Sequence, residues 1–352
     1  MDALADRLAH RTLELVDIPS ESRHEAEVAA RVRSLVPPAF EPVYEAEDAF
    51  LWALPRRPGV PLVLLAGHYD TVPAQDNVPG RIADGAVHGL GAADMKGGLA
   101  VLLEVARDLA SPTLDVALLA FGKEELPASE SPLPHLFETA SLVHEAELAI
   151  LLEPTSNAIQ AGCVGNLNAR LHFHGISGHS ARPWLADNAI ERAIAGLGPI
   201  AALERREAVV GGLPFYEVVT ITRVAGGIAD NIVPDHVTAH LNYRYAPDRT
   251  PAEAERYLRT LVPDGAELEL TGDSPPARVV SDTPLVRALR DQGGLELEPK
   301  QAWTNVADFT TRGIDAVNFG PGAPAFAHRR DEQVEIAALV RTYESLRAFL
   351  GG

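Results

Sequence analysis

The chain has a single cysteine, Cys163, among its 352 residues, so it has no partner with which to form an intrachain disulfide. A protein without disulfides fits a reducing compartment. We interpret Cys163 as a small buried hydrophobic residue rather than as a nucleophile, because free cysteine is among the most buried residue types.

Long apolar runs are also missing. The longest uncharged apolar stretches fall far short of the roughly 20 residues that a membrane-spanning helix needs. The first residues, MDALADRLAHRTLELV, lack the basic segment that precedes the apolar part of a secretory signal. We therefore expect a cytoplasmic protein that does not associate with membranes.

Basic residues are scarce relative to acidic ones. The sequence has 30 Lys and Arg against 49 Asp and Glu, which gives a formal net charge of -19. The negative field of such a protein repels nucleic-acid backbones and anionic lipid surfaces, so neither is an expected partner. An anionic small-molecule substrate would need local arginines to overcome this field.

Aromatic residues make up only 6% of the chain, but 46% of the residues are hydrophobic, which is typical of a folded globular protein. The length predicts about two domains. Four short apolar runs, at 60–67, 115–122, 147–154 and 314–320, are typical of strands buried on both faces of a mainly parallel sheet.

Helical spacing of apolar residues occurs at 2–16, 23–36, 95–110 and 332–350. The segment at 95–110 separates the first two apolar runs, which predicts a βαβ unit. These patterns predict an α/β domain in which helices sandwich a mixed, mainly parallel sheet.

The pattern changes near residue 167. The segments NARLHFHG, YEVVTITRV and HVTAHLNYRY alternate apolar and polar residues, as strands with one solvated face do. Helical patterns near 187–204 and 251–262 complete a β-α-β-β-α-β series, which predicts a ferredoxin-like α+β module. We therefore place an inserted domain at 167–275 and assign 1–166 and 276–352 to one discontinuous domain.

Polar residues follow the predicted buried strands. In open α/β sheets, functional groups gather beyond the carboxyl ends of the strands. Taken singly, Asp94 has the position of a helix N-cap, adjacent glutamates are usually a solvated loop, and a lone histidine is usually structural. These explanations do not account for so many such residues at one sheet edge, namely His68, Asp70, Asp94, Glu124, Glu125, Glu153 and His328.

Histidine and carboxylate side chains without cysteine suit Zn²⁺ or a similar divalent ion. They are too numerous for one tetrahedral ion, so we expect two ions that share a carboxylate and activate a water. Asp70 follows His68 by two residues, which places both side chains on one face of an extended strand. Asp70 is therefore expected to accept the imidazole N–H of His68 and to orient the ring.

The segments GHYDTVP, GAADMKGG, GKEE, the Glu153-Pro pair and AHRRDE resemble, in order and spacing, the motifs of the M20 metallopeptidase family of co-catalytic zinc amidohydrolases. The resemblance covers essentially the whole chain and implies a zinc-peptidase-like catalytic domain with an inserted lid and dimerisation domain. Within the family, HSARPWLADNAI, NYRYAPDR and NFGPG are most similar to bacterial succinyl-diaminopimelate desuccinylases of the actinobacterial type.

Position by position, the resemblance implies that Asp94 bridges two zinc ions, with His68 and Glu153 on one ion and Glu125 and His328 on the other. Similar ligands also accept Co²⁺ or Mn²⁺. The remaining glutamate, Glu124, becomes the general base. The family often has a cis peptide after the bridging aspartate, here between Asp94 and Met95. Gly97 and Gly98 are expected to let the following helix approach the strands closely.

The resemblance also assigns residues outside the metal motifs. His179 is similar to a lid histidine that reaches the active site of the partner in a homodimer, where it stabilises the oxyanion. Arg244 matches a carboxylate-binding lid arginine. Further expected substrate contacts are Arg182, where some Gram-negative desuccinylases have tyrosine, and Asn231, Thr304 and Gly322.

The resemblance implies an enzyme that hydrolyses the amide bond of N-succinyl-LL-2,6-diaminopimelate to succinate and diaminopimelate, for lysine and cell-wall synthesis. One alternative keeps the machinery but removes other groups, as acetylornithine deacetylases, N-acyl-amino-acid hydrolases and carboxypeptidases do. Another is a metal-binding or regulatory protein without turnover. Glu124 argues against the latter, because proton transfer requires it and metal ligation does not.

Overall fold

The computed structural model describes residues 3–46 and 48–351, and the chain divides into two compact units. The first unit comprises Met1–Ala161, Val280–Glu298 and Asp308–Gly352, and the second comprises Gly162–Val279 and Pro299–Ala307. Each unit is described by itself below.

The assignment of Pro299–Ala307 to the first domain was wrong, because this segment groups with the second unit. Hydrogen bonds account for the grouping. The Gln301 side-chain oxygen accepts the Tyr216 backbone N–H at 3.2 Å, and Trp303 Nε1 donates to the Pro275 carbonyl at 3.0 Å. Such contacts between distant parts of the chain leave no periodic signal in the sequence.

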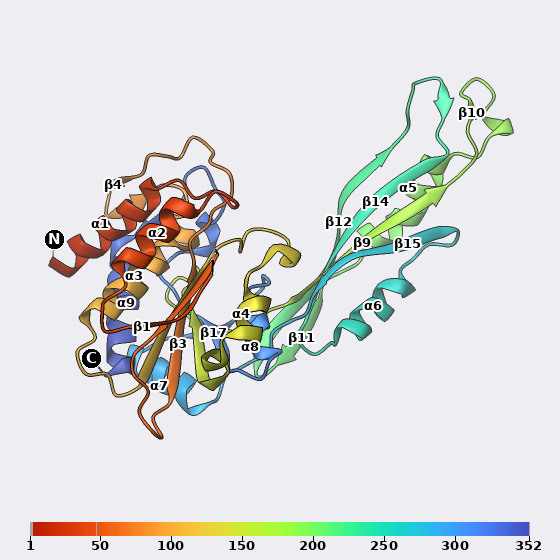
Figure 1. The fold of residues 1–352 in the computed structure, drawn as a ribbon. Coiled ribbons are helices and arrows are strands. Elements are labelled where there is room, and N and C mark those ends of the chain that lie inside the picture. The colour runs from red at the N-terminus through yellow and green to blue at the C-terminus, as the bar shows by residue number, and fades with distance from the viewer. Residues whose placement is uncertain (1–2, 47, 352) are drawn as a thin grey trace. The chain divides into compact units, whose positions relative to one another are not determined.

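Among the described residues, an eight-stranded sheet forms the centre of the first unit, in the order β1-β2-β6-β3-β7-β17-β8-β16 (Figure 1). The neighbours β6, β3, β7 and β17 run parallel, as the four apolar runs predicted. All residues of β3 and β6 are buried. The strands are β1 (Glu41–Glu45), β2 (Ala49–Ala53), β3 (Leu62–His68), β6 (Asp115–Phe121), β7 (Ala146–Leu151), β8 (Ile159–Ala161), β16 (Leu297–Pro299) and β17 (Ala316–Asn318).

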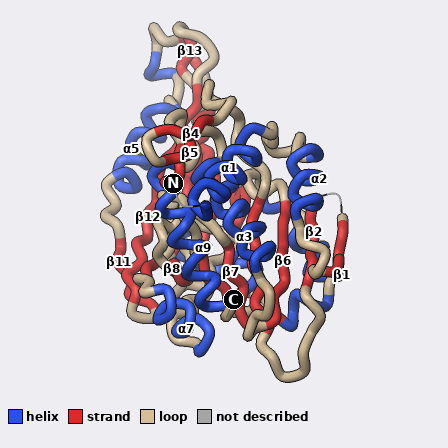
Figure 2. Tube along the Cα trace, turned by 90° about the vertical axis from the view of Figure 1, so that its left-hand side faces the viewer, coloured by secondary structure: helices blue, strands red, loops and turns tan. Residues whose placement is uncertain are grey.

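Helices cover both faces of this sheet, as predicted. On one face lie α1 (Ala3–Asp17), α2 (Ala26–Leu35), α3 (Gly97–Asp108), α7 (Pro284–Gly293) and α9 (Ile336–Leu350), which stand in front of the strands in Figure 2. On the other face lies α4 (Leu133–Thr139) (Figure 1). There the Phe137 ring contacts that of Phe309 in α8 (Val306–Thr310), with centroids 5.1 Å apart.

The predicted helix at 332–350 begins only at Ile336. The preceding residues form β18 (Gln333–Glu335), which pairs with β5 (Ala86–His88), and β5 pairs with β4 (Arg81–Ala83). Val334 is buried between two less buried neighbours, which a strand pairing accommodates.

The segment in front of α3 departs from a simple helix start. Residues Ala92–Lys96 form a helical turn with a cis peptide between Asp94 and Met95, as the family resemblance implied. Asp94 does not occupy the N-cap position of this helix. Helix α3 starts at Gly97, and the residue at its cap position is Lys96, which makes no side-chain capping bond.

Gly98 lets α3 approach the sheet closely, as predicted. A Cβ atom at this position would lie 2.1 Å from the Leu152 carbonyl oxygen, just after β7. Backbone atoms cannot yield as a flexible side chain can, so only glycine fits here.

The second unit contains a five-stranded antiparallel sheet in the order β11-β12-β14-β9-β15, counted among the described residues. The series β9-α5-β12-β14-α6-β15 has the predicted β-α-β-β-α-β form, with β11 added at the edge. Its elements are β9 (Gly165–His174), α5 (Ala189–Ala201), β11 (Arg206–Val210), β12 (Leu213–Gly226), β14 (His236–Tyr245), α6 (Pro251–Thr260) and β15 (Ala266–Ser274), and a separate ribbon pairs β10 (Gly178–His179) with β13 (Ile232–Val233).

One face of this sheet is buried by α5 and α6. Leu167, Leu171 and Phe173 alternate along β9 and pack with Leu197 of α5 and Leu258 of α6. The intervening residues of β9 face the other side, as the alternating sequence predicted. Cys163 is buried at the start of this unit, as expected.

None of the helices in the described ranges is both long enough and apolar enough to cross a membrane.

Replacing Gly98 with alanine is expected to lower the free energy of unfolding by about 1–3 kcal/mol, because the new methyl group overlaps the Leu152 carbonyl. Urea unfolding of the purified variant measures this loss. The control is Gly198→Ala in α5, where a Cβ meets nothing within 4 Å. The free energy of unfolding of this variant should be unchanged or higher by up to about 1 kcal/mol, because alanine favours a helix more than glycine does. Equal stability of Gly98→Ala and the unmodified chain would contradict the close approach.

Candidate metal centre

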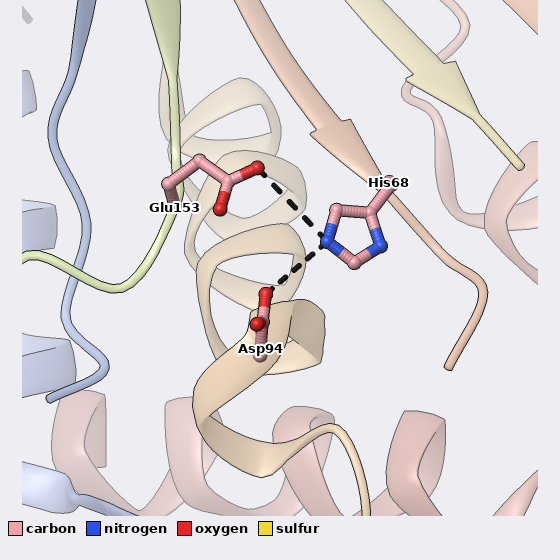
Figure 3. Close-up of side chains that lie close together, drawn as sticks. All are labelled: His68, Asp94 and Glu153. Carbon is pink, nitrogen blue, oxygen red and sulfur yellow. Dashed lines mark hydrogen bonds and ion pairs between the residues drawn. The ribbon is translucent and has the colours of Figure 1, made fainter. Parts of the chain in front are cut away.

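The parallel strands of the first unit bring their terminal residues to one edge of the sheet. β3 ends at His68, Glu153 follows β7 by two residues, and Asp94 stands on the turn that leads into α3. Figure 3 shows these three side chains pointing toward one another. His68 Nε2 lies 3.2 Å from Asp94 Oδ1 and 4.0 Å from Glu153 Oε1.

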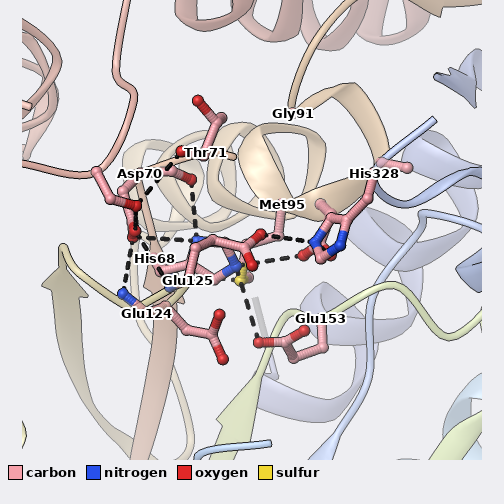
Figure 4. A network of polar contacts seen from close by, with 12 residues as sticks. His68, Asp70, Thr71, Gly91, Met95, Glu124, Glu125, Glu153 and His328 are labelled. Atoms are coloured by element: carbon pink, nitrogen blue, oxygen red, sulfur yellow. Dashed lines mark hydrogen bonds and ion pairs between the residues drawn. The ribbon is translucent and has the colours of Figure 1, made fainter. Parts of the chain in front are cut away.

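A second group forms on the other side of Asp94. His328 Nε2 lies 2.9 Å from Glu125 Oε1 and 3.5 Å from Asp94 Oδ2 (Figure 4). The two oxygens of Asp94 therefore face two different histidines. Each histidine also has a second carboxylate close by, so two sets of donor atoms share Asp94, and a third set joins His68 with Glu124 and Glu125.

Asp70 is fully buried and connects His68 to the loop that carries Glu124 and Glu125. Its Oδ1 lies 3.4 Å from His68 Nδ1 and accepts the Glu124 backbone N–H at 3.1 Å. Its Oδ2 accepts the Glu125 backbone N–H at 3.2 Å and the Ser22 hydroxyl at 2.6 Å. This carboxylate thus fixes the ring of His68 and the start of the acidic loop at the same time (Figure 4).

The sequence analysis missed Glu332, although this residue ends the AHRRDE segment. Its carboxylate is buried and accepts three backbone N–H groups of the turn around Asp94, from Gly91 at 2.9 Å and from Ala93 and Asp94 at 3.0 Å each. Glu332 therefore holds the turn that presents Asp94. Its place four residues after His328 was visible in the sequence, but no spacing rule predicts that a glutamate accepts backbone N–H groups.

The acidic groups shift the titration of one another. Burial raises the pKa of Glu124 well above its usual range, and the negative charges of Glu153, Glu125 and Asp94 act in the same direction against the opposing effect of His68. A carboxyl group with a raised pKa beside candidate metal ligands has the property that proton transfer near neutral pH requires.

The pKa values of the two imidazoles are also raised, but by interactions with negative charges that favour the protonated ring. Burial disfavours the charged form of His68, but hydrogen bonds to Asp70 and Asp94 prevail and hold its pKa well above its usual value. Hydrogen bonds to Asp94 and Glu125 raise the pKa of His328 to about 10. The carboxylates outnumber the imidazoles, so this cluster stabilises positive charge strongly.

Three of the residues predicted from the lid segments come together in the second unit. His179 of β10 pairs with Ile232 of β13, and the Ser180 backbone N–H donates to the Asn231 carbonyl at 3.0 Å. The Arg182 backbone N–H donates to the His179 carbonyl at 2.8 Å. The roles of these residues in catalysis and substrate binding stay predictions.

The ring of His179 is also oriented. Its Nδ1 accepts the Ala181 backbone N–H at 3.1 Å, so in the neutral imidazole the hydrogen is on Nε2. His179 therefore presents a hydrogen-bond donor to its surroundings.

The remaining predicted contacts have distinct environments. Arg244 is partly buried on β14, where its Nε donates to Asn242 Oδ1 at 2.9 Å and burial lowers its pKa. Thr304 is buried, and its carbonyl lies 3.8 Å from Cys163 Sγ. Gly322 belongs to the first unit, where a Cβ would lie 2.3 Å from the Ala93 carbonyl oxygen, next to Asp94.

Comparison with known proteins gives relatives along nearly the full chain. A succinyl-diaminopimelate desuccinylase from Corynebacterium glutamicum is 38% identical over 363 residues, which cover 98% of each chain. A protein from Mycobacterium tuberculosis, named as a candidate succinyl-diaminopimelate desuccinylase DapE, is 38% identical over 346 residues and 97% of each chain.

Among solved structures, the aminopeptidase PepT from Bacillus cereus has a TM-score of 0.79 at 20% identity and covers 98% of each chain, which shows a common fold. The model of the family described as peptidase family M20/M25/M40 matches residues 64–351. The M20 resemblance predicted from the motifs is thus confirmed, and the chain belongs to peptidase family M20/M25/M40.

Proposed function

We propose that this protein hydrolyses the amide bond of N-succinyl-LL-2,6-diaminopimelate, with two divalent cations as cofactors, and releases succinate and LL-2,6-diaminopimelate. The observation that carries the chemistry is the division of donor atoms around Asp94, with Glu124 beside them. The substrate is supported by the names of the relatives that are 38% identical along nearly the whole chain.

The residues present fit a pair of cations. His68, Asp94 and Glu153 form one set of oxygen and nitrogen donors, and Asp94, Glu125 and His328 form the other. Such mixed donors suit Zn²⁺, and Co²⁺ or Mn²⁺ are accepted by similar sites. The excess of carboxylates in the cluster would be neutralised by the ions.

When bound, the cations would lower the pKa of water toward about 7 and polarise the amide carbonyl of the substrate. Glu124 then takes a proton from the attacking water and delivers it to the leaving amine as the C–N bond breaks. Asp70 keeps His68 in one orientation and fixes the backbone of Glu124 through the same carboxylate.

The second unit supplies groups for binding. The substrate carries three carboxylates and one ammonium, and the protein has a net charge of -19, so local cations are needed. Arg244 is suited to this role, because its guanidinium has no ion pair with a carboxylate among the residues the structure describes. The Nε2–H of His179 is suited to donate to the carbonyl oxygen as negative charge develops there.

We further propose that the protein is a cytoplasmic homodimer assembled through the second unit. Large apolar side chains are exposed on segments around β10 and α5, among them Trp184 at 75% and Ile228 at 87% exposure. Ile176, Leu185 and Ile194 are exposed as well. A second copy that covers these side chains would remove them from water.

A second candidate function keeps the same site but cleaves another N-acyl amino acid or a peptide. The shared fold with an aminopeptidase supports this alternative. A role in metal binding without turnover is less well supported, because the relatives that are 38% identical along nearly the whole chain are named as desuccinylases.

The proposed reaction is tested with purified protein loaded with two equivalents of Zn²⁺ and a panel of N-succinyl-diaminopimelate, N-acetylornithine, other N-acyl amino acids and dipeptides. N-succinyl-diaminopimelate should have the highest kcat/KM of the panel, because its three carboxylates can pair with arginines such as Arg244. A higher kcat/KM on N-acetylornithine or on a dipeptide would favour the second candidate instead.

Substituting Glu124 with glutamine is expected to lower kcat by about 10²–10⁴-fold, since the amide cannot take a proton from water. Metal content, measured by mass spectrometry of the dialysed protein, should stay unchanged. Glu125→Gln is the contrast: its side chain is a predicted ligand, so this variant should lose metal. Full turnover by Glu124→Gln would exclude Glu124 as the base.

Replacement of Glu332 by glutamine should weaken Zn²⁺ binding by about 10–100-fold, because an amide N–H would face the Gly91 N–H and disturb the turn of Asp94. Competition with a chromogenic chelator measures the affinity, and circular dichroism checks the fold. Glu335→Gln, an exposed neighbour on β18, is the control and should bind as the unmodified chain does. Normal affinity in Glu332→Gln would mean that the turn does not depend on this carboxylate.

A further inference from the structure

Three histidines gather on the face of the second unit's sheet that α5 and α6 leave uncovered. His172 and His174 alternate with the core residues Leu171 and Phe173 on β9, and His236 begins the neighbouring antiparallel strand β14. The Cα of His236 pairs with that of His174 in the sheet register. The strands β14, β9 and β15 run side by side in Figure 1.

The rings of these histidines form a compact triangle. Their centroids are 5.5 Å apart for His172 and His236, 5.2 Å for His174 and His236, and 6.5 Å for His172 and His174. His172 Nδ1 lies 3.3 Å from His236 Nε2. The two nitrogens share a hydrogen bond at this distance. Two nitrogens on a tetrahedral zinc ion, each at about 2.0–2.1 Å, have a similar separation of about 3.3–3.4 Å, so a metal ion could replace the shared hydrogen.

A glutamate on β15 sets the hydrogen positions of His172. Its Nε2 lies 3.0 Å from Glu269 Oε2 and donates to that carboxylate, which leaves the Nδ1 lone pair directed at His236 in the neutral ring. A carboxylate behind a histidine, with the other ring nitrogen free to coordinate, is the usual arrangement of histidine ligands in metal sites. Arg170 holds Glu269 from the other side at 3.4 Å.

The third ring is less constrained. His174 is exposed, and its Nε2 lies 3.7 Å from Glu267 Oε2. A rotation about its side-chain bonds is enough to turn a ring nitrogen toward His236, since the two residues are direct cross-strand neighbours. Side chains at i and i+2 on one strand and a cross-strand neighbour all lie on the same side of the sheet.

We propose that His172, His174 and His236 form a binding site for a divalent transition-metal ion of the Zn²⁺, Cu²⁺ or Ni²⁺ class, with an open fourth position for water. Imidazole ligands suit this class, and the site shares no residue with the candidate metal centre. The proposal does not depend on the proposed reaction.

The test uses full-length, untagged protein with His68→Gln, Asp94→Asn and His328→Gln, which removes both imidazoles of the candidate metal centre and leaves the three histidines of the second unit intact. After removal of metal by a chelator, Cu²⁺ is added as the probe, because it binds nitrogen ligands most strongly among these ions. Electron paramagnetic resonance is expected to show one equivalent of Cu²⁺ with nitrogen hyperfine coupling. Adding His172→Gln or His236→Gln should weaken this binding at least about 10–100-fold.

The matched control is His240→Gln. His240 lies on β14, as His236 does, but its ring bonds to the Thr222 hydroxyl and not to the three histidines. It should retain the signal. Glu269→Gln should still bind one equivalent of Cu²⁺, but with lower affinity. The proposal is overturned if the nitrogen-coordinated Cu²⁺ is absent, or if it persists at the same affinity in both His172→Gln and His236→Gln. Circular dichroism of each variant confirms that the fold is retained.

Discussion

The buried carboxylate of Asp70 is the contact on which the arrangement of the site depends. It lies against the ring of His68 and accepts two consecutive backbone N–H groups from the loop after the neighbouring strand. One negative charge thereby fixes a candidate ligand and the candidate base relative to each other. Because the group is fully buried, these hydrogen bonds must offset its desolvation, and the loss of any of them leaves part of a buried charge uncompensated.

Much of the first unit could be predicted from the sequence. The runs that became β3, β6, β7 and β17 are nearly continuously apolar, and parallel strands buried on both faces have that pattern. Because the carboxyl ends of such strands meet at one edge, the clustering of His68, Glu125 and Glu153 followed from the strand assignments. The motif resemblance then supplied what spacing alone does not give, namely the sharing of Asp94.

The sequence was less informative where contacts join distant segments. Glu332 was missed because its partners are backbone groups, which have no residue-specific pattern. The strand Gln333–Glu335 was absorbed into a predicted helix because three residues are too few to show a period of two. Pro299–Ala307 was misplaced for a related reason, since its grouping depends on hydrogen bonds such as that between Gln301 and Tyr216.

The two oxygens of Asp94 face different histidines, so two bound cations would share the charge of one carboxylate. The first ion to bind would neutralise part of the Asp94 charge, so less negative charge would remain to attract the second ion. Stepwise loading would then be coupled, with unequal successive affinities, and the coupling free energy would be the same whichever side filled first.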